Sequence, residues 1–254
     1  MPRIGLKLWN INIDYYLPEA RKLYSQGIFD YIELYIVPGH LAELSLWKGL
    51  EIPFDIHAPH SRHGMNLAKK KLRETNLQLY AETKTYADEL NARHIVFHGG
   101  AGGDYKETAK QLENISDPRA LIENKPIEPL PFIKEDFYVG SVIEEIGFIK
   151  NFAKCGFCLD IGHAFCAANY LGFEPYQYVE QFMRLSPQIM HLSDLKTNGT
   201  QDEHLNFGQG DLDLKRLLNI LPANMDITIE TEKKSKENLT DFVADVRFLL
   251  EKIK

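Results

Sequence analysis

The sequence has few cysteines and no long apolar run. Its 254 residues include 3 cysteines. This is an odd number, and too few for a disulfide framework in a chain of this length. Cys155 and Cys158 have a C-x-x-C spacing, but no second cysteine pair completes a zinc site, so we expect buried core cysteines. The N-terminus has no signal-peptide pattern, and no run of about eighteen apolar residues occurs. The sequence therefore predicts a soluble, cytoplasmic protein with no membrane partner.

The chain also lacks an excess of positive charge. It has 29 Lys and Arg against 36 Asp and Glu, a formal net charge of −7, which argues against loose, salt-driven binding to nucleic acid or to an anionic membrane. Hydrophobic residues make up 44% of the 254 residues, enough to bury a large core. We expect residues 1–254 to form a single domain.

Short apolar runs alternate with helical patterns along the chain. Strands are predicted over residues 4–9, 31–36, 54–57, 94–98, 120–123, 157–160, 189–192 and 227–230. Helices are predicted over residues 17–26, 67–90, 142–152, 175–185, 212–221 and 239–253, with a loop or short helix reaching Trp47. Parallel strands need crossover helices and are buried on both faces. The pattern thus predicts an α/β fold, a single (β/α)8 TIM barrel.

Two segments between these elements have unusual composition. Residues 99–103 read Gly-Gly-Ala-Gly-Gly, which predicts a turn because glycine tolerates left-handed backbone conformations. Residues 126–131 are rich in proline and cannot form a regular helix. We expect this proline-rich segment to be a lid.

Five of the predicted strands end on His, Asp or Glu. In a TIM barrel the carboxyl ends of the strands meet at the active site, so these side chains should converge. A cluster of carboxylates is destabilised by repulsion and desolvation unless cations compensate it, and divalent metals bind imidazole and carboxylate together. We therefore expect a metal site. Four further residues are expected to be structural: Glu33 as the partner of a lysine, His94 in the core, and His40 and His63 in solvated loops.

The motifs around these residues resemble those of the xylose-isomerase-like barrel superfamily, which includes the endonuclease IV class of DNA-repair enzymes and many sugar isomerases and epimerases. They read His-Ala-Pro from 57, Phe-His-Gly-Gly from 97, Ile-Glu-Asn from 122, Leu-Asp-Ile-Gly-His from 159, His-Leu-Ser-Asp from 191, Asp-Glu-His from 202 and Ile-Glu-Thr from 229. The resemblance implies up to three divalent ions, zinc or manganese. It implies nine metal ligands: His57, His98, Glu123, Asp160, His163, His191, Asp202, His204 and Glu230. The small-molecule relatives use the counterparts of Glu123, Asp160, His191 and Glu230.

The chain departs from endonuclease IV in its loops. The Arg and the Tyr-Leu pair with which endonuclease IV distorts the DNA duplex have no counterpart here. The glycine-rich turn after Glu-Asn is replaced by residues 125–132, an apolar cover better suited to a small ligand than to a bent duplex. We expect Trp9, Lys125 and Phe132 to bind substrate. Aromatic residues are expected on the same rim at Trp9, Tyr15, Tyr35, Phe132, Phe165 and Tyr170.

These features favour a metal-dependent isomerase or epimerase whose substrate is a sugar, a sugar phosphate or a related polyol. Glu123 and Glu230 would exchange protons beside a carbonyl that the metal polarises. The close alternative is endonuclease IV-type hydrolysis of abasic DNA, in which bridging metals generate a hydroxide. A barrel that binds a ligand without turnover is a third, weaker hypothesis. The sequence leaves the oligomeric state open.

Overall fold

The computed structural model describes residues 2–253, apart from the side chain of Tyr15. Eight parallel strands pair in chain order, and β8 pairs with β1 to close a barrel. The strands are β1 (Ile4–Trp9), β2 (Tyr31–Tyr35), β3 (Phe54–His57), β4 (Ile95–His98), β5 (Ala120–Glu123), β6 (Gly156–Asp160), β7 (Ile189–Leu192) and β8 (Asp226–Ile229). The predicted α/β fold, a (β/α)8 TIM barrel, is confirmed.

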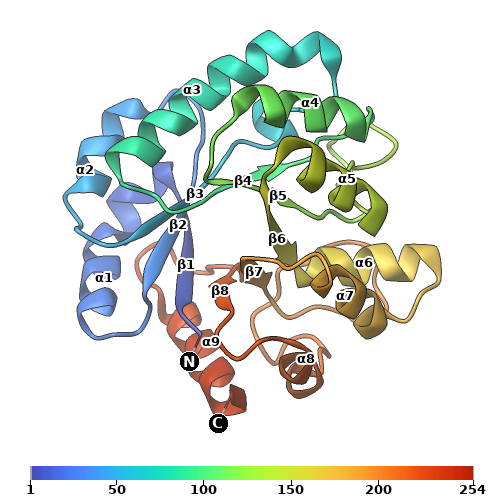
Figure 1. Cartoon of the computed structure of the whole chain (residues 1–254). Coiled ribbons are helices and arrows are strands. Elements are labelled where there is room, and N and C mark those ends of the chain that lie inside the picture. The colour runs from blue at the N-terminus through green and yellow to red at the C-terminus, as the bar shows by residue number, and fades with distance from the viewer. Residues whose placement is uncertain (1, 254) are drawn as a thin grey trace.

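Helices surround the strands (Figure 1). Within residues 2–253 they are α1 (Ile13–Ser25), α2 (Leu44–Lys48), α3 (Arg73–Glu89), α4 (Tyr105–Ile115), α5 (Ile143–Ala153), α6 (Ile161–Leu171), α7 (Pro175–Met183), α8 (Leu214–Ile220) and α9 (Thr240–Ile253). Short 3-10 turns cover residues 10–12, 41–43, 61–63 and 70–72. No helix among the described residues is both long and apolar enough to cross a membrane.

The strand predictions differ from the structure by at most one residue at either end. The bounds of β1, β3, β5 and β7 are those predicted. The largest functional consequence is at β8, which ends at Ile229, so that Glu230 follows the strand instead of ending it. Strand ends depend on which backbone groups find partners on the neighbouring strands, and a single strand's sequence does not contain that information.

The sequence pattern missed two helices, α4 and α6. The α4 helix begins directly after the glycine-rich turn, where the Asp104 side chain accepts a hydrogen bond from the Lys106 backbone N–H. The α6 helix follows β6 without a loop, and Asp160 caps it by accepting a hydrogen bond from the His163 backbone N–H at 2.7 Å. Most of α6 is buried, so its sequence shows no polar face that would reveal a helical period.

Two predicted helix starts were wrong. The α1 helix begins at Ile13 and carries Pro18 in its interior, whereas proline usually marks the first helical position. The α3 helix begins at Arg73 instead of residue 67. The Asn76 side chain accepts a hydrogen bond from the Asn66 backbone N–H and donates one to the Asn66 carbonyl, which holds the preceding segment as a loop. Helices α5, α7, α8 and α9 lie within two residues of their predicted bounds. The cysteines are free, with Cys158 and Cys166 buried and Cys155 partly buried.

Candidate metal and substrate site

Four neighbouring strands build two layers inside the barrel. The lower layer is a cluster of buried side chains, Val96, Leu121, Cys158 and Ile189. Two residues further along the same strands stand His98, Glu123, Asp160 and His191. Side chains two apart on a strand point to the same side, so each strand follows an apolar interior residue with a polar one. The polar layer lies at the carboxyl end of the barrel, which is where TIM-barrel active sites are found.

A first group of possible ligands consists of His57, His98 and Glu123. The Nε2 atoms of His57 and His98 lie 3.1 and 3.2 Å from Glu123 Oε2. His57 Nδ1 is 2.8 Å from the backbone oxygen of Ala58, which can only accept, and burial lowers the pKa of His57. The neutral ring therefore carries its proton on Nδ1 and turns its Nε2 lone pair toward a carboxylate oxygen. Two acceptors at this distance need a cation between them.

A second group consists of Glu123, Asp160, His191 and Glu230. His191 Nδ1 is buried without a hydrogen-bond partner and lies 3.1 Å from Glu230 Oε1, 3.6 Å from Glu123 Oε2 and 3.9 Å from Asp160 Oδ2. Burial raises the pKa of the Asp160 carboxyl, and the neighbouring carboxylates raise it further. One imidazole nitrogen facing three carboxylates is a donor set that suits a divalent cation.

A third group consists of His163, Asp202 and His204. His163 Nε2 and His204 Nε2 lie 3.2 and 2.7 Å from Asp202 Oδ2. His163 Nδ1 is 2.9 Å from the backbone oxygen of Asn124, which leaves Nε2 to face the carboxylate. Asp202 Oδ1 and His204 Nδ1 are buried without a hydrogen-bond partner. The structure thus brings all nine residues that the sequence singled out into one cluster, in which Glu123 belongs to two groups.

Sequence reasoning missed Lys7 and underestimated Glu33. Lys7 Nζ lies 2.6 Å from Glu33 Oε1 and 2.5 Å from Glu230 Oε1. Glu33 is thus the partner of a lysine, as predicted, but its Oε2 also lies 2.9 Å from His191 Nε2. The signal available in the sequence was a lysine inside the apolar run of β1. In the structure Lys7 is in register with Glu33 on β2. A charge at an inward strand position must be paired.

Lys125 lies among the three ligand groups. Its Nζ atom is 3.0 Å from His163 Nε2 and 3.4 Å from both His98 Nε2 and Glu123 Oε1. Lys125 also lines the cavity above the cluster. An ammonium in this position compensates the negative charge of the carboxylates.

A cavity of about 730 Å³ lies over the cluster, and Glu123, Glu230, Trp9 and Phe132 all line it. Its volume is within the range of small-ligand sites. The cover is a loop between β5 and α5 that contributes Pro126, Leu130, Phe132, Ile133 and Tyr138. We call residues 125–140 the lid loop.

Two contacts hold the lid loop against the loop after β3. Lys69 Nζ pairs with Glu135 Oε2 at 2.9 Å, and the Arg62 guanidinium lies 5.1 Å from the centre of the Phe132 ring. The lid loop is therefore fixed to the loop after β3, two strands away from the strand β5 that it follows.

Some predicted rim residues lie elsewhere. Tyr35 lines the cavity, but Phe165 is fully buried in α6 and Tyr170 is exposed on the same helix, because α6 was not foreseen; the Tyr15 side chain lies outside the described residues. His63 is not a solvated loop residue, since its Nδ1 is 2.6 Å from the Tyr35 hydroxyl. His60, which the sequence did not single out, lines the cavity and stacks on His98.

Comparison with known proteins places this geometry in context. Residues 41–252 match a family model described as a xylose isomerase-like TIM barrel. The uncharacterized protein MJ1614 of Methanocaldococcus jannaschii is 23% identical over 221 residues, which cover 82% of this chain and 81% of that protein.

Two solved structures have the same fold. A D-tagatose 3-epimerase-like protein superposes with a TM-score of 0.75 at 20% identity, covering 99% of this chain and 97% of the other. Endonuclease IV from Thermus thermophilus superposes with a TM-score of 0.70 at 21% identity, covering 99% of each chain. At these identities the two likenesses establish the fold alone, so the reaction has to be argued from the site.

Proposed function

The chain belongs to the xylose isomerase-like TIM barrel family, and we propose that it is a divalent-metal-dependent enzyme that isomerises or epimerises a sugar, a sugar phosphate or a related polyol. The observation that carries the proposal is the covered cavity of about 730 Å³, with Glu123 and Glu230 on its wall beside the unpartnered His191 Nδ1. We further propose that residues 1–254 act as a single cytoplasmic domain.

The donor set fits a divalent ion. His191 Nδ1 has no hydrogen-bond partner, and carboxylate oxygens of Glu123, Asp160 and Glu230 surround it. Imidazole and carboxylate donors suit zinc and manganese. An ion bound by these four residues would polarise a substrate carbonyl.

Glu230 is the candidate proton acceptor. Burial raises the pKa of its carboxyl, but His191 and Lys7 outweigh burial and hold the pKa below its usual range, so the group is ionised at neutral pH. A carboxylate on the cavity wall can take a proton from a carbon beside a carbonyl. Glu123, also on this wall, would be the second acid–base group: it would take up a proton from water and deliver it to the carbon, while Glu230 releases the proton it accepted to solvent. Trp9 and the lid loop exclude water, and Lys125 can donate to a substrate oxygen.

Proton exchange with solvent tests this proposal. Purified protein loaded with Mn²⁺ or Zn²⁺ is incubated in D₂O with a panel of ketoses, aldoses and their phosphates, and deuterium incorporation is followed by mass spectrometry. We expect incorporation at the carbon beside the carbonyl for a subset of the panel. A sugar that binds without exchange would favour a ligand-binding barrel.

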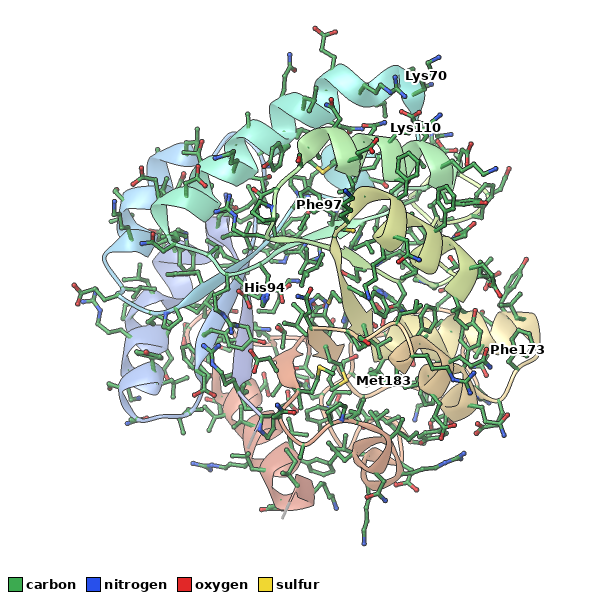
Figure 2. The ribbon with its side chains drawn as sticks, in the orientation of Figure 1. Lys70, His94, Phe97, Lys110, Phe173 and Met183 are labelled. Atoms are coloured by element: carbon green, nitrogen blue, oxygen red, sulfur yellow. The ribbon has the colours of Figure 1, made fainter. Side chains whose placement is uncertain are left out.

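Endonuclease IV-type hydrolysis is the second candidate, because all nine ligand positions are present in one cluster. The surroundings of the cavity do not favour it. Lys70 lies at the outer edge near the start of α3, away from the barrel centre (Figure 2), and Lys69 is paired with Glu135. A duplex needs an open groove with several phosphate contacts. We therefore expect no tight binding to abasic-site duplex DNA at physiological salt, and incision beside the abasic site would promote this candidate.

A further inference from the structure

The Lys125 ammonium lies where the first and third ligand groups meet. It contacts His98 from the first group, His163 from the third and Glu123 Oε1, and its side chain is only 7% exposed. Within residues 2–253 these contacts do not include Asp160, His191 or Glu230. In the second ligand group, therefore, the lysine contacts only Glu123. In the first and third groups it contacts an imidazole nitrogen that a metal ion would need as a ligand.

An ammonium and a metal ion cannot occupy the same position at an imidazole nitrogen. His163 Nδ1 is occupied by the Asn124 carbonyl, so Nε2 is its remaining donor atom, and Lys125 Nζ lies 3.0 Å from it. A metal ion would have to sit about 2.0–2.1 Å from that nitrogen. A lysine ammonium and a divalent ion held this close in a buried site repel each other strongly.

The main chain keeps Lys125 in this place. Its backbone N–H donates to the Gly140 carbonyl at 3.0 Å, which ties the start of the lid loop to its end. The preceding residue, Asn124, is fixed by two hydrogen bonds between its side chain and the backbone of Asp160, at 2.8 and 2.9 Å. The backbone at Lys125 is thus held by its own hydrogen bond and by those of Asn124 before it, and the lysine side chain enters the cluster from this fixed position.

We propose that Lys125 is a built-in cation that takes the place of a metal between the first and third groups. The wild-type chain then holds one divalent ion tightly, through Glu123, Asp160, His191 and Glu230, and binds further ions at least about tenfold more weakly than a chain without the lysine. The inference rests on the proposed metal dependence and changes the expected count of three ions. A single ion beside an ammonium suits the polarisation of a carbonyl, whereas the endonuclease IV-type alternative would use bridging metals.

Metal titration of Lys125→Met tests the inference. Methionine has nearly the same length and no charge, and Lys233→Met is the matched control because Lys233 lines the same cavity but bonds to the Thr231 carbonyl. Each protein is stripped with chelator and titrated with Co²⁺, following absorption, and elemental analysis counts the bound ions. We expect one tight ion in the wild type and in Lys233→Met, and at least one more in Lys125→Met.

The wild-type titration is decisive even if Lys125→Met fails to fold. Three equally tight ions in the wild type would overturn the role of Lys125 and leave the metal proposal intact. An unchanged count and affinity in folded Lys125→Met would overturn it as well. No bound ion in any of the proteins would instead sink the proposed metal dependence.

Discussion

His191 and Glu33 form a buried pair in which His191 Nε2 lies 2.9 Å from Glu33 Oε2. The Thr228 hydroxyl also donates to this oxygen, at 2.8 Å. Burial raises the pKa of Glu33, but His191 and Lys7 outweigh it and lower the pKa to about 2. The carboxylate can only accept, so it places a proton on His191 Nε2 and turns Nδ1 toward the carboxylates of Glu123, Asp160 and Glu230. Glu33 thus orients His191, which we propose as a metal ligand.

Glu33→Gln should weaken metal binding. The amide has nearly the same volume but loses the charge that fixes the His191 tautomer, and such losses cost about 10–100-fold in affinity. Isothermal titration with Zn²⁺ measures the effect. Glu43→Gln is the control, because Glu43 pairs with His40 on a surface turn. Equal affinity of Glu33→Gln and wild type would show that His191 is oriented by other contacts.

Glu230→Gln should abolish proton exchange and leave the fold intact. The amide fills the same volume but neither accepts a proton nor serves as an anionic ligand. Lys7 keeps Glu33 as its partner at 2.6 Å, so no buried charge is left alone. Deuterium incorporation and thermal unfolding are measured on the same sample. A variant that unfolds early but exchanges at the wild-type rate per folded molecule would make Glu230 a structural residue.

The metal-free protein should lose stability as the pH rises. Burial lowers the pKa of both His163 and His204, but acidic neighbours outweigh it. Asp160 is the main cause that raises the pKa of His163 from 6.5 to about 10. Asp202 is the main cause that raises the pKa of His204 from 6.5 to about 9. A histidine whose pKa is raised by folding contributes stability that is full below about pH 6.5 and lost as the pH passes the folded value. The melting temperature of the chelator-treated protein should therefore decrease as the pH rises from 6.5 to 10.

Bound metal reverses this dependence, because its ligands must be deprotonated. The difference in Tm between metal-loaded and chelator-treated protein should grow from about pH 6 to about pH 9. In a chain of this size each 1 kcal/mol corresponds to about 2–4 °C, which differential scanning fluorimetry resolves. A difference that is constant over this range would mean that metal binding displaces no proton from His191, the imidazole of the four-residue site, whose pKa its acidic neighbours raise well above its usual value despite burial.

Phe132→Ala should weaken sugar binding without changing the metal content. Phe132 lines the cavity and holds the lid loop through Arg62, and losing its ring should cost about tenfold in affinity. Phe173→Ala is the matched control, because Phe173 is equally exposed, 54% against 53%, but projects from the far side of α6 and α7 (Figure 2). Equal dissociation constants for the two variants would remove Phe132 from the substrate site.

Part of the candidate metal cluster could be predicted from local sequence. His57, His98, Glu123 and Asp160 each end an apolar run, and each occupies the last position of its strand. Parallel barrel strands share one direction, so residues at their carboxyl ends must converge. The fold and these four members of the cluster follow from the strand ends that the sequence pattern marks. The other five, His163, His191, Asp202, His204 and Glu230, do not occupy the last position of a strand, and the resemblance supplied the full set of nine.

The sequence could not predict how the members are held. The pairing of Lys7 with Glu33 depends on the register between β1 and β2, and that of Glu33 with His191 joins β2 to β7 across the barrel interior. Neither relation leaves a trace in the spacing of residues. Helix α6 was missed for a similar reason, since a buried helix has no polar face.

The position of Lys125 was decided by tertiary structure alone. The sequence places it two residues after Glu123 at the start of an irregular loop, where its side chain could face solvent, substrate or metal ligands. The hydrogen bonds from its backbone to Gly140 and from Asn124 to Asp160 direct it into the cluster. The sequence by itself determines which charges the chain carries, but the distances between them, and with them the electrostatic balance of a buried site, exist only once segments far apart in the chain have packed together.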